Sequence, residues 1–228
     1  MAYKITTITL PMPFRMGMVN SYLIETSMGH LLVDTASSTA RKELRAELER
    51  NGCRSDSLKL IILTHGDFDH IGNAAYLRSR FGARVAMHRD DSGMAERGDM
   101  FVNRKKPNII IKGLLPLFSG FGSSERFKPD ILVGDGYEFS DYGFEAKVIS
   151  LPGHSQGSIG IITIHGELFC GDLFENTKGP KPNPLMDDPA AARVSIERLA
   201  SMKITTIYPG HGQPFLMEGL KSSMTMAA

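Results

Sequence analysis

Residues 64–70 read Thr-His-Gly-Asp-Phe-Asp-His and follow directly on the apolar run 58–63, Leu-Lys-Leu-Ile-Ile-Leu. A short run this rich in Leu and Ile predicts a buried strand. In an extended turn after that strand, the side chains of residues i and i+2 point the same way, so His65 and Asp67 can bind the same ion. The pattern therefore indicates a metal-binding loop at the carboxyl end of a strand, where open α/β sheets tend to build their sites.

The second half of the same motif adds two more potential ligands. Asp69 and His70 open a helix that apolar spacing predicts over residues 69–80. A carboxylate at a helix N-terminus is favoured by the exposed amides and by the macrodipole. Two pairs of ligands are thus expected to face one point.

Three further ligand types recur at later points of the chain, each directly after a glycine. They are His154, Asp172 and His211, and each follows an apolar run that predicts a strand. Glycine beside a ligand lets the backbone turn sharply and approach an ion closely. Four histidines and three carboxylates at predicted strand ends therefore indicate a metal centre rather than isolated core histidines.

The order of these motifs resembles the metallo-β-lactamase superfamily: H-x-[H/D]-x-D-H, then Gly-His, Gly-Asp and Gly-His. The resemblance runs over about residues 20–215, and it implies an α/β fold in a four-layer α-β-β-α sandwich. It also implies a two-metal ligand set. The first metal would be held by His65, Asp67 and His154, the second by Asp69, His70 and His211, and Asp172 would bridge them.

One position departs from the family pattern, because the superfamily usually has His where this chain has Asp67. The flavodiiron proteins that resemble this fold use a similar carboxylate, Glu, to hold two irons. The family implies zinc, but three carboxylates with a bridging hydroxide bring the formal charge of a two-dication cluster to zero. A carboxylate suits iron or manganese better than imidazole does, so we expect those metals to bind at least as readily as zinc.

The composition predicts a single globular domain over residues 1–228. The chain has 42% apolar residues and a formal net charge of +1, which gives no global attraction to nucleic acid or to anionic membranes. No run approaches the ~18 apolar residues of a membrane span, and the amino terminus lacks a signal-peptide pattern. With Cys53 and Cys170 as its only cysteines, a disulfide framework is not expected. We expect a cytoplasmic protein with a small-molecule substrate.

The remaining patterns predict short strands and further helices, with Asp34 tying a strand end to the metal loop. Strands are expected over residues 4–10, 20–25, 30–35, 83–87, 131–133, 137–139, 145–151, 159–164, 167–170 and 204–208. Helices are expected over residues 41–50, 88–97 and 187–202. By family resemblance, the apolar loop 12–18 would lie near the mouth of the site, and ordinary edge packing is the alternative.

Residues 98–129 are longer than an ordinary connection and carry Phe118 and Phe121 among other apolar residues. We interpret this excursion as an inserted helical cover over the metals that sets substrate preference. The alternatives are a structural excursion or a contact within a homo-oligomer.

The ligand set predicts hydrolysis of a small ester, lactone, thioester or related substrate by a metal-bridging hydroxide. Asp69, which by resemblance binds the second metal, would also orient the nucleophile and accept its proton. No Ser-His-Asp or catalytic Cys signature competes with this interpretation. The alternative is an iron-dependent oxidoreductase, flavodiiron-like or persulfide-dioxygenase-like. Nucleic-acid processing is disfavoured because the one basic cluster, at residues 104–106, is short.

Overall fold

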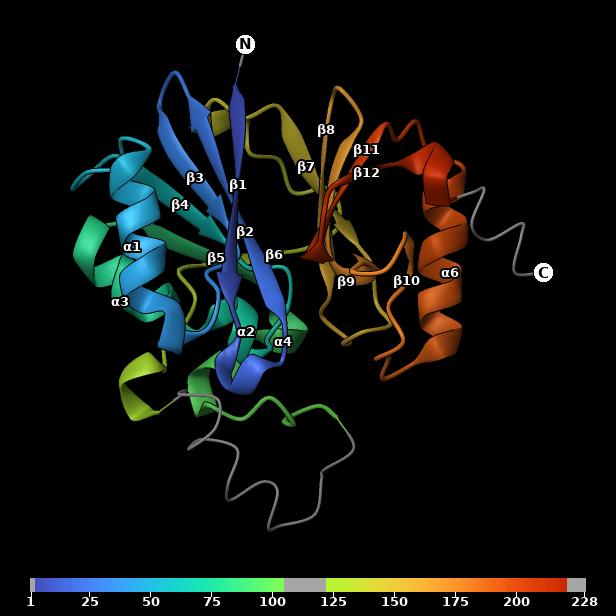
Figure 1. Ribbon diagram of the computed structural model, residues 1–228, viewed down its shortest axis with the longest axis horizontal. Coiled ribbons are helices and arrows are strands. Elements are labelled where there is room, and N and C mark those ends of the chain that lie inside the picture. The colour runs from blue at the N-terminus through green and yellow to red at the C-terminus, as the bar shows by residue number, and fades with distance from the viewer. Residues whose placement is uncertain (1–2, 105–121, 221–228) are drawn as a thin grey trace.

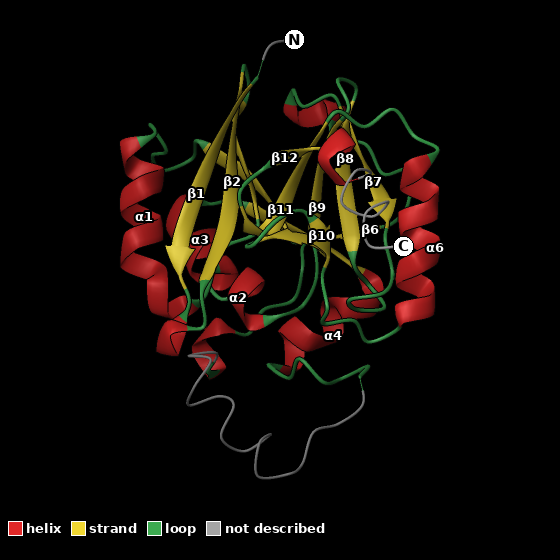
Figure 2. Cartoon of the chain, turned by 45° about the vertical axis from the view of Figure 1, so that its right-hand side comes forward, coloured by secondary structure: helices red, strands yellow, loops and turns green. Residues whose placement is uncertain are grey.

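Two β-sheets pack face to face, and helices cover their outer faces (Figure 1). This computed structural model describes residues 3–104 and 122–220. Figure 2 shows the same layers from another side, with α1 and α6 on opposite flanks of the strands. The four-layer α-β-β-α sandwich expected from the sequence is confirmed.

The first sheet has six strands in the order β1-β2-β3-β4-β5-β6. Its first three strands pair antiparallel, whereas β3, β4, β5 and β6 run parallel. The parallel strands are almost continuously apolar, as expected of strands covered on both faces. The strands are β1 (Lys4–Pro11), β2 (Met18–Thr26), β3 (Gly29–Val33), β4 (Leu58–Ile62), β5 (Arg84–His88) and β6 (Ile131–Val133).

Helices α1 (Arg41–Arg50) and α3 (Ala74–Phe81) cover the outer face of this sheet. Leu44 and Leu48 of α1 lie one turn apart, and both are fully buried in that layer. The short helix α2 (Phe68–Ile71) and helix α4 (Arg89–Arg97) lie at the lower end of the sheet in Figure 1.

The second sheet has the order β12-β11-β9-β8-β7, with β10 paired to the far part of β9. Its outer face is covered by α6 (Pro189–Ala200). Asp188 caps α6 by accepting from the amides of Ala190 and Ala191, and Pro189 supplies the fixed φ of a first helical position. The strands are β7 (Ala146–Ser150), β8 (Ile159–Thr163), β9 (Glu167–Asn176), β10 (Lys181–Pro182), β11 (Thr206–Gly212) and β12 (Phe215–Leu216).

The layer between the sheets is rich in aromatic rings. Phe169 of the second sheet contacts the Tyr22 ring of the first, with ring centroids 5.3 Å apart, and stacks on Tyr208 at 4.9 Å. Single-turn 3-10 helices occur at η1 (Pro13–Arg15), η2 (Ser38–Ala40), η3 (Ser123–Glu125) and η4 (Ser140–Tyr142). Among the helices that the structure describes, none is long and apolar enough to cross a membrane.

The prediction of a single helix over residues 69–80 is wrong, because the structure splits this segment into α2 (Phe68–Ile71) and α3 (Ala74–Phe81), with Gly72 and Asn73 between them. A side chain at Gly72 would lie 2.4 Å from the backbone nitrogen of Ser38, so only glycine fits there. The Asn73 amide donates to the carbonyls of Thr35 and Ser37, both at 2.8 Å. These contacts fasten the start of α3 to the loop after β3.

Other expectations for the elements also differ from the structure. Strand β9 continues through Asp172, and β11 continues through His211, so neither residue lies after its strand. The segment 137–139 forms one isolated bridge, between Glu138 and Lys147, instead of a strand.

The cover expected at 98–129 is described only in part, because residues 105–121, with Phe118 and Phe121, lie outside the described residues. At its described ends, Met100 lines the cleft at the metal motifs, whereas Phe127 is buried in the outer layer of the first sheet.

Candidate metal centre

The structure brings all seven motif residues together where loops and strands of the two sheets meet. The side chains of His65 and His70 are fully buried, and that of His211 is 15% exposed. The first sheet contributes the loop after β4 together with α2, and the second contributes the loop after β7 and strands β9 and β11. The residues are His65, Asp67, Asp69, His70, His154, Asp172 and His211.

Two groups of possible ligands stand out among the described residues. In the first, ligand atoms of His65, His154 and Asp172 all lie within 4.8 Å of one another, and Asp69, His70 and His211 form the second in the same way. Asp172 connects the groups, with His154 Nε2 at 3.9 Å and His211 Nε2 at 3.3 Å from Oδ2. Its other oxygen, Oδ1, lies 3.4 Å from His70 Nε2.

These distances fit the ligand shell of a small dication. Bonds of about 2.0–2.2 Å at tetrahedral angles place two ligand atoms roughly 3.3–3.6 Å apart. His211 Nε2 lies 3.5 Å from Asp69 Oδ2, within this range. A side chain at Gly210 would come within 2.1 Å of Asp172 Oδ1, so the glycine next to His211 permits this close approach.

Each of the four motif histidines has its Nδ1 directed away from the centre and its Nε2 directed toward it. His154 Nδ1 donates to the Leu185 carbonyl at 2.6 Å, and His211 Nδ1 donates to the Met18 carbonyl at 2.7 Å. The Nδ1 atoms of His70 and His65 contact Asp34 Oδ2 and Thr64 Oγ1, at 2.8 and 2.9 Å. Such contacts fix the tautomer that presents an Nε2 lone pair.

Three buried atoms at the centre have no hydrogen-bond partner among the described residues: His65 Nε2, His70 Nε2 and Asp172 Oδ1. Burying an unpaired polar atom costs about 1–3 kcal/mol. Three such atoms aimed at one point fit a site that is completed by a ligand, and nitrogen and carboxylate donors suit a first-row dication. The residues present therefore fit a two-metal centre.

Asp34 orients this site from behind. Its carboxylate accepts from the amide and the hydroxyl of Thr64, at 2.9 and 2.7 Å, as well as from His70. Asp34 adopts φ 59°, a left-handed conformation that non-glycine residues seldom take. The expected tie between the end of β3 and the metal loop is confirmed.

Replacing Asp34 by Ala should lower metal affinity by about 10- to 100-fold, because His70 loses the partner that fixes its orientation. Competition with a chelator of known affinity measures this effect. Asp34→Asn is the comparison, since it retains an oxygen for Thr64 and should lose less. Equal metal affinity in wild type and Asp34→Ala would contradict the role.

Asp91, which was not anticipated from the sequence, joins the two histidine loops. Its buried carboxylate accepts from the amides of Gly66 and Gly157, at 2.9 and 2.8 Å, and from the Ser155 hydroxyl at 2.6 Å. The sequence signal for this role of Asp91 was weak, since it consists only of a carboxylate on the same buried face of α4 as Met94.

Strand β2 holds His211 in a similar way. The Asn20 amide donates to the carbonyls of Pro209 and Gly212, at 3.0 and 2.6 Å, and the Tyr22 hydroxyl donates to Pro209 at 2.5 Å. These bonds link the two sheets at the end of β11 that carries His211.

Arg104, the second residue that was missed, pairs with Asp67. It also lies 2.5 Å from the Asp187 carboxylate and donates to the His154 carbonyl at 3.3 Å. The expected preference for iron or manganese rests on a cluster with a formal charge of zero. The positive charge of Arg104 raises that formal charge by one. With Arg104 beside Asp67, the pair is neutral, like the imidazole usual at that position.

The four motif histidines differ in the direction of their pKa shifts. Burial lowers the pKa of His65, and the neighbouring His70 and His154 lower it further, so His65 stays neutral. For His70 and His154, burial also lowers the pKa, but nearby carboxylates outweigh it and raise each to about 9. The carboxylates of Asp172 and Asp69 likewise outweigh burial at His211 and raise its pKa to about 12.

These raised pKa values predict opposite pH dependences with and without metal. In the metal-free protein, His70 and His154 contribute stability below their ordinary pKa of 6.5, and that contribution is lost as the pH rises through about 9. Metal must displace those protons, so metal affinity should rise over the same window. Urea unfolding from pH 6 to 9, with chelator and with zinc, measures both slopes. Parallel slopes would contradict the prediction.

A cleft of about 540 Å³ opens onto the motif residues. Met12, Met16 and Met18 line this cleft, as expected for a loop 12–18 that lies near the mouth of the site. Phe14 and Arg15 in this loop adopt positive φ, at 55° and 59°, which marks a strained backbone at the rim. Apolar side chains along the cleft are Met12, Met16, Met18, Phe68, Met100 and Leu185.

Two facing sheets with outer helices and two histidine–carboxylate groups at one end define the class, an α-β-β-α sandwich with a candidate two-metal centre. The family model for the metallo-beta-lactamase superfamily matches residues 15–211. The chain therefore belongs to the metallo-beta-lactamase superfamily, and the resemblance drawn from the motifs is confirmed.

Individual relatives agree with this assignment. The hydroxyacylglutathione hydrolase GloC of Haemophilus influenzae is 30% identical over 161 residues, which cover 68% of this chain and 69% of the relative. A metallo-beta-lactamase family protein of Thermus thermophilus has a TM-score of 0.74 at 23% identity, covering 98% of this chain and 79% of that one. TTHA1623, solved in a di-iron-bound form, has a TM-score of 0.66 at 27% identity, covering 91% and 94%. Curated relatives are longer, and the chain spans 58% of one and 72% of another.

Proposed function

We propose that this protein is a metal-dependent hydrolase that acts, as one domain, on a small ester, lactone, thioester or related substrate. One observation carries the proposal: three buried donor atoms, His65 Nε2, His70 Nε2 and Asp172 Oδ1, converge with no hydrogen-bond partner in the described part of the chain. The proposed ligands of the first position are His65, His154 and Asp67, and those of the second are Asp69, His70 and His211. Asp172 is the proposed bridge.

Two bound dications would supply a water with a pKa lowered toward ~7 and a Lewis acid for the substrate oxygen. The chain supplies the rest. Asp69, in the first turn of α2 and in contact with His70 and His211, orients the water and accepts its proton. The methionine-lined cleft binds the apolar part of the substrate and excludes bulk water.

Thioesters are the leading substrate class. The relative GloC is named a hydroxyacylglutathione hydrolase, and it is 30% identical to this chain. The flexible methionine side chains of the cleft suit an acyl chain of variable shape.

Zinc is the proposed metal, with iron as an accepted substitute. The neutral Asp67–Arg104 pair leaves the donor set close to that of the family, which favours zinc. The second candidate function, an iron-dependent oxidoreductase, is favoured by one observation, the di-iron-bound form of TTHA1623.

Metal analysis and a substrate screen test both functions. Protein expressed in medium supplemented with zinc, iron and manganese should contain close to two metals per chain. Chelation should abolish hydrolysis of thioesters and lactones, and zinc should restore it. A protein that holds no metal, or metal-loaded protein that is inactive on every ester, lactone and thioester, would refute the hydrolase. Oxygen consumption that depends on iron would instead support the oxidoreductase.

A further inference from the structure

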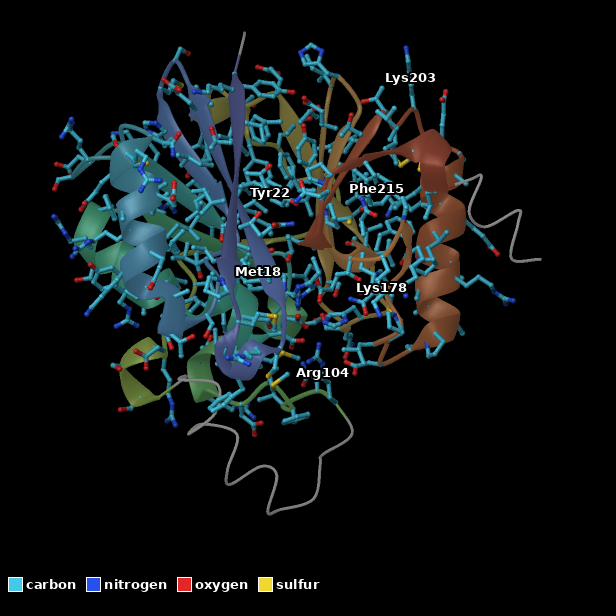
Figure 3. The ribbon with its side chains drawn as sticks, in the orientation of Figure 1. Met18, Tyr22, Arg104, Lys178, Lys203 and Phe215 are labelled. Carbon is cyan, nitrogen blue, oxygen red and sulfur yellow. The ribbon has the colours of Figure 1, made fainter. Side chains whose placement is uncertain are left out.

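Arg104 is almost fully enclosed at the edge of the candidate centre. Its side chain is 7% exposed, and Figure 3 shows it at the lower end of the molecule, below the strands. The guanidinium contacts the carboxylates of Asp67 and Asp187 and the carbonyl of His154. Three anchors from separate parts of the chain hold this cation in place.

Both oxygens of Asp67 are engaged within the site. Oδ2 lies 3.0 Å from His154 Nε2 and 3.8 Å from His65 Nε2, whereas Oδ1 accepts from Arg104. Asp67 is the N-cap residue of α2, yet its side chain makes no capping hydrogen bond. The carboxylate is therefore positioned between the histidines of one metal position and a fixed cation.

The two proposed metal positions differ in whether a cation lies beside the aspartate of that position. A guanidinium has five N–H donors, no lone pair, and no loss of its proton in proteins. It cannot bind a metal, and it repels a dication placed beside Asp67. Among the described residues, Asp69 at the other position pairs only with His70 and His211. The close group at the first position is His65, His154 and Asp172, without Asp67.

We propose that Arg104 makes the two metal positions unequal by competing with the metal for Asp67. The position of Asp69, His70 and His211 fills first, and the position of His65 and His154 is the weaker one. Arg104 is a positioning residue that acts through Asp67. This inference rests on the proposed two-metal function.

The test is a titration of metal-free full-length protein with zinc, by calorimetry and by competition with chelators. Wild type should bind two ions in steps separated by about tenfold or more in Kd. In Arg104→Gln, the weaker step should tighten by about tenfold or more, because Asp67 becomes free to bind the ion. The tighter step should stay unchanged.

Three further variants isolate the cause. In an Asp67→Asn background, Arg104→Gln should change the weaker step less than it does in wild type, since only the direct repulsion between the guanidinium and the ion remains. Asp187→Asn removes the other carboxylate beside Arg104, which is 40% exposed, so it should fold even where Arg104→Gln does not. With less of its charge neutralised, Arg104 should hold Asp67 more strongly, and the weaker step should loosen. Arg78→Gln, which breaks the ion pair with Asp130 away from the cleft, is the matched control and should change neither step.

The failures are distinguishable. Wild type that binds no zinc would refute the proposed function itself. Two equal steps in wild type, a weaker step that loosens or stays unchanged in folded Arg104→Gln, or a weaker step that tightens or stays unchanged in Asp187→Asn, would overturn the role of Arg104 and leave the two-metal hydrolase intact.

Discussion

Asp172→Asn should lower hydrolysis by about a thousandfold or more and should leave the protein with at most one metal per chain. Asp172 lies between the two histidine groups, 3.9 Å from His154 Nε2 and 3.3 Å from His211 Nε2. An amide has no negative charge to share between two dications, so both positions weaken together. Loss of about 4 kcal/mol of transition-state stabilisation corresponds to about a thousandfold in rate.

Elemental analysis and kcat/KM on the best thioester or lactone measure the two effects. The matched control is Asp135→Asn, which removes the charge of an exposed carboxylate paired with Arg198. The control should keep both metals and full activity. Asp172→Asn with two metals and near-normal activity would show that the carboxylate does not bridge.

Asp69→Asn should also have a large effect, a fall in kcat of about 10²- to 10⁴-fold at saturating metal. Asp69 is 6% exposed and contacts both His70 and His211 in the second group. An asparagine oxygen still reaches a metal there, but it cannot accept a proton from the water. The loss should therefore appear mainly in kcat, whereas KM changes little.

The measurement is a full rate profile at several metal concentrations, with Asp141→Asn, an exposed carboxylate in η4, as the control. If added metal restores the activity of Asp69→Asn completely, Asp69 serves only as a ligand. If the deficit persists with both metals bound, its role in proton transfer is supported.

Local sequence patterns predicted most of the elements because their signals lie within a few residues. Helix α1 begins at Arg41 and ends at Arg50 as expected, since Leu44 and Leu48 mark one face and Asn51-Gly52 ends the run. Strand β6 also has the expected bounds. The split at Gly72 and Asn73 was missed because its cause is contact with the loop after β3, from which Asn73 is separated by 36 and 38 residues in its two hydrogen bonds.

By itself, the sequence determined the superfamily, the layered α/β fold and the residues that gather at the candidate centre. Those residues occur in ordered motifs, and each motif includes a glycine that permits close approach. The tertiary structure alone decided how the donors are aimed. Asp34, Asp91 and Arg104 act across 36, 64 and 37 residues, on His70, Ser155 and Asp67. Such pairs have no period or spacing in the chain, because packing of distant elements brings them together, and that packing placed a compensating cation beside Asp67.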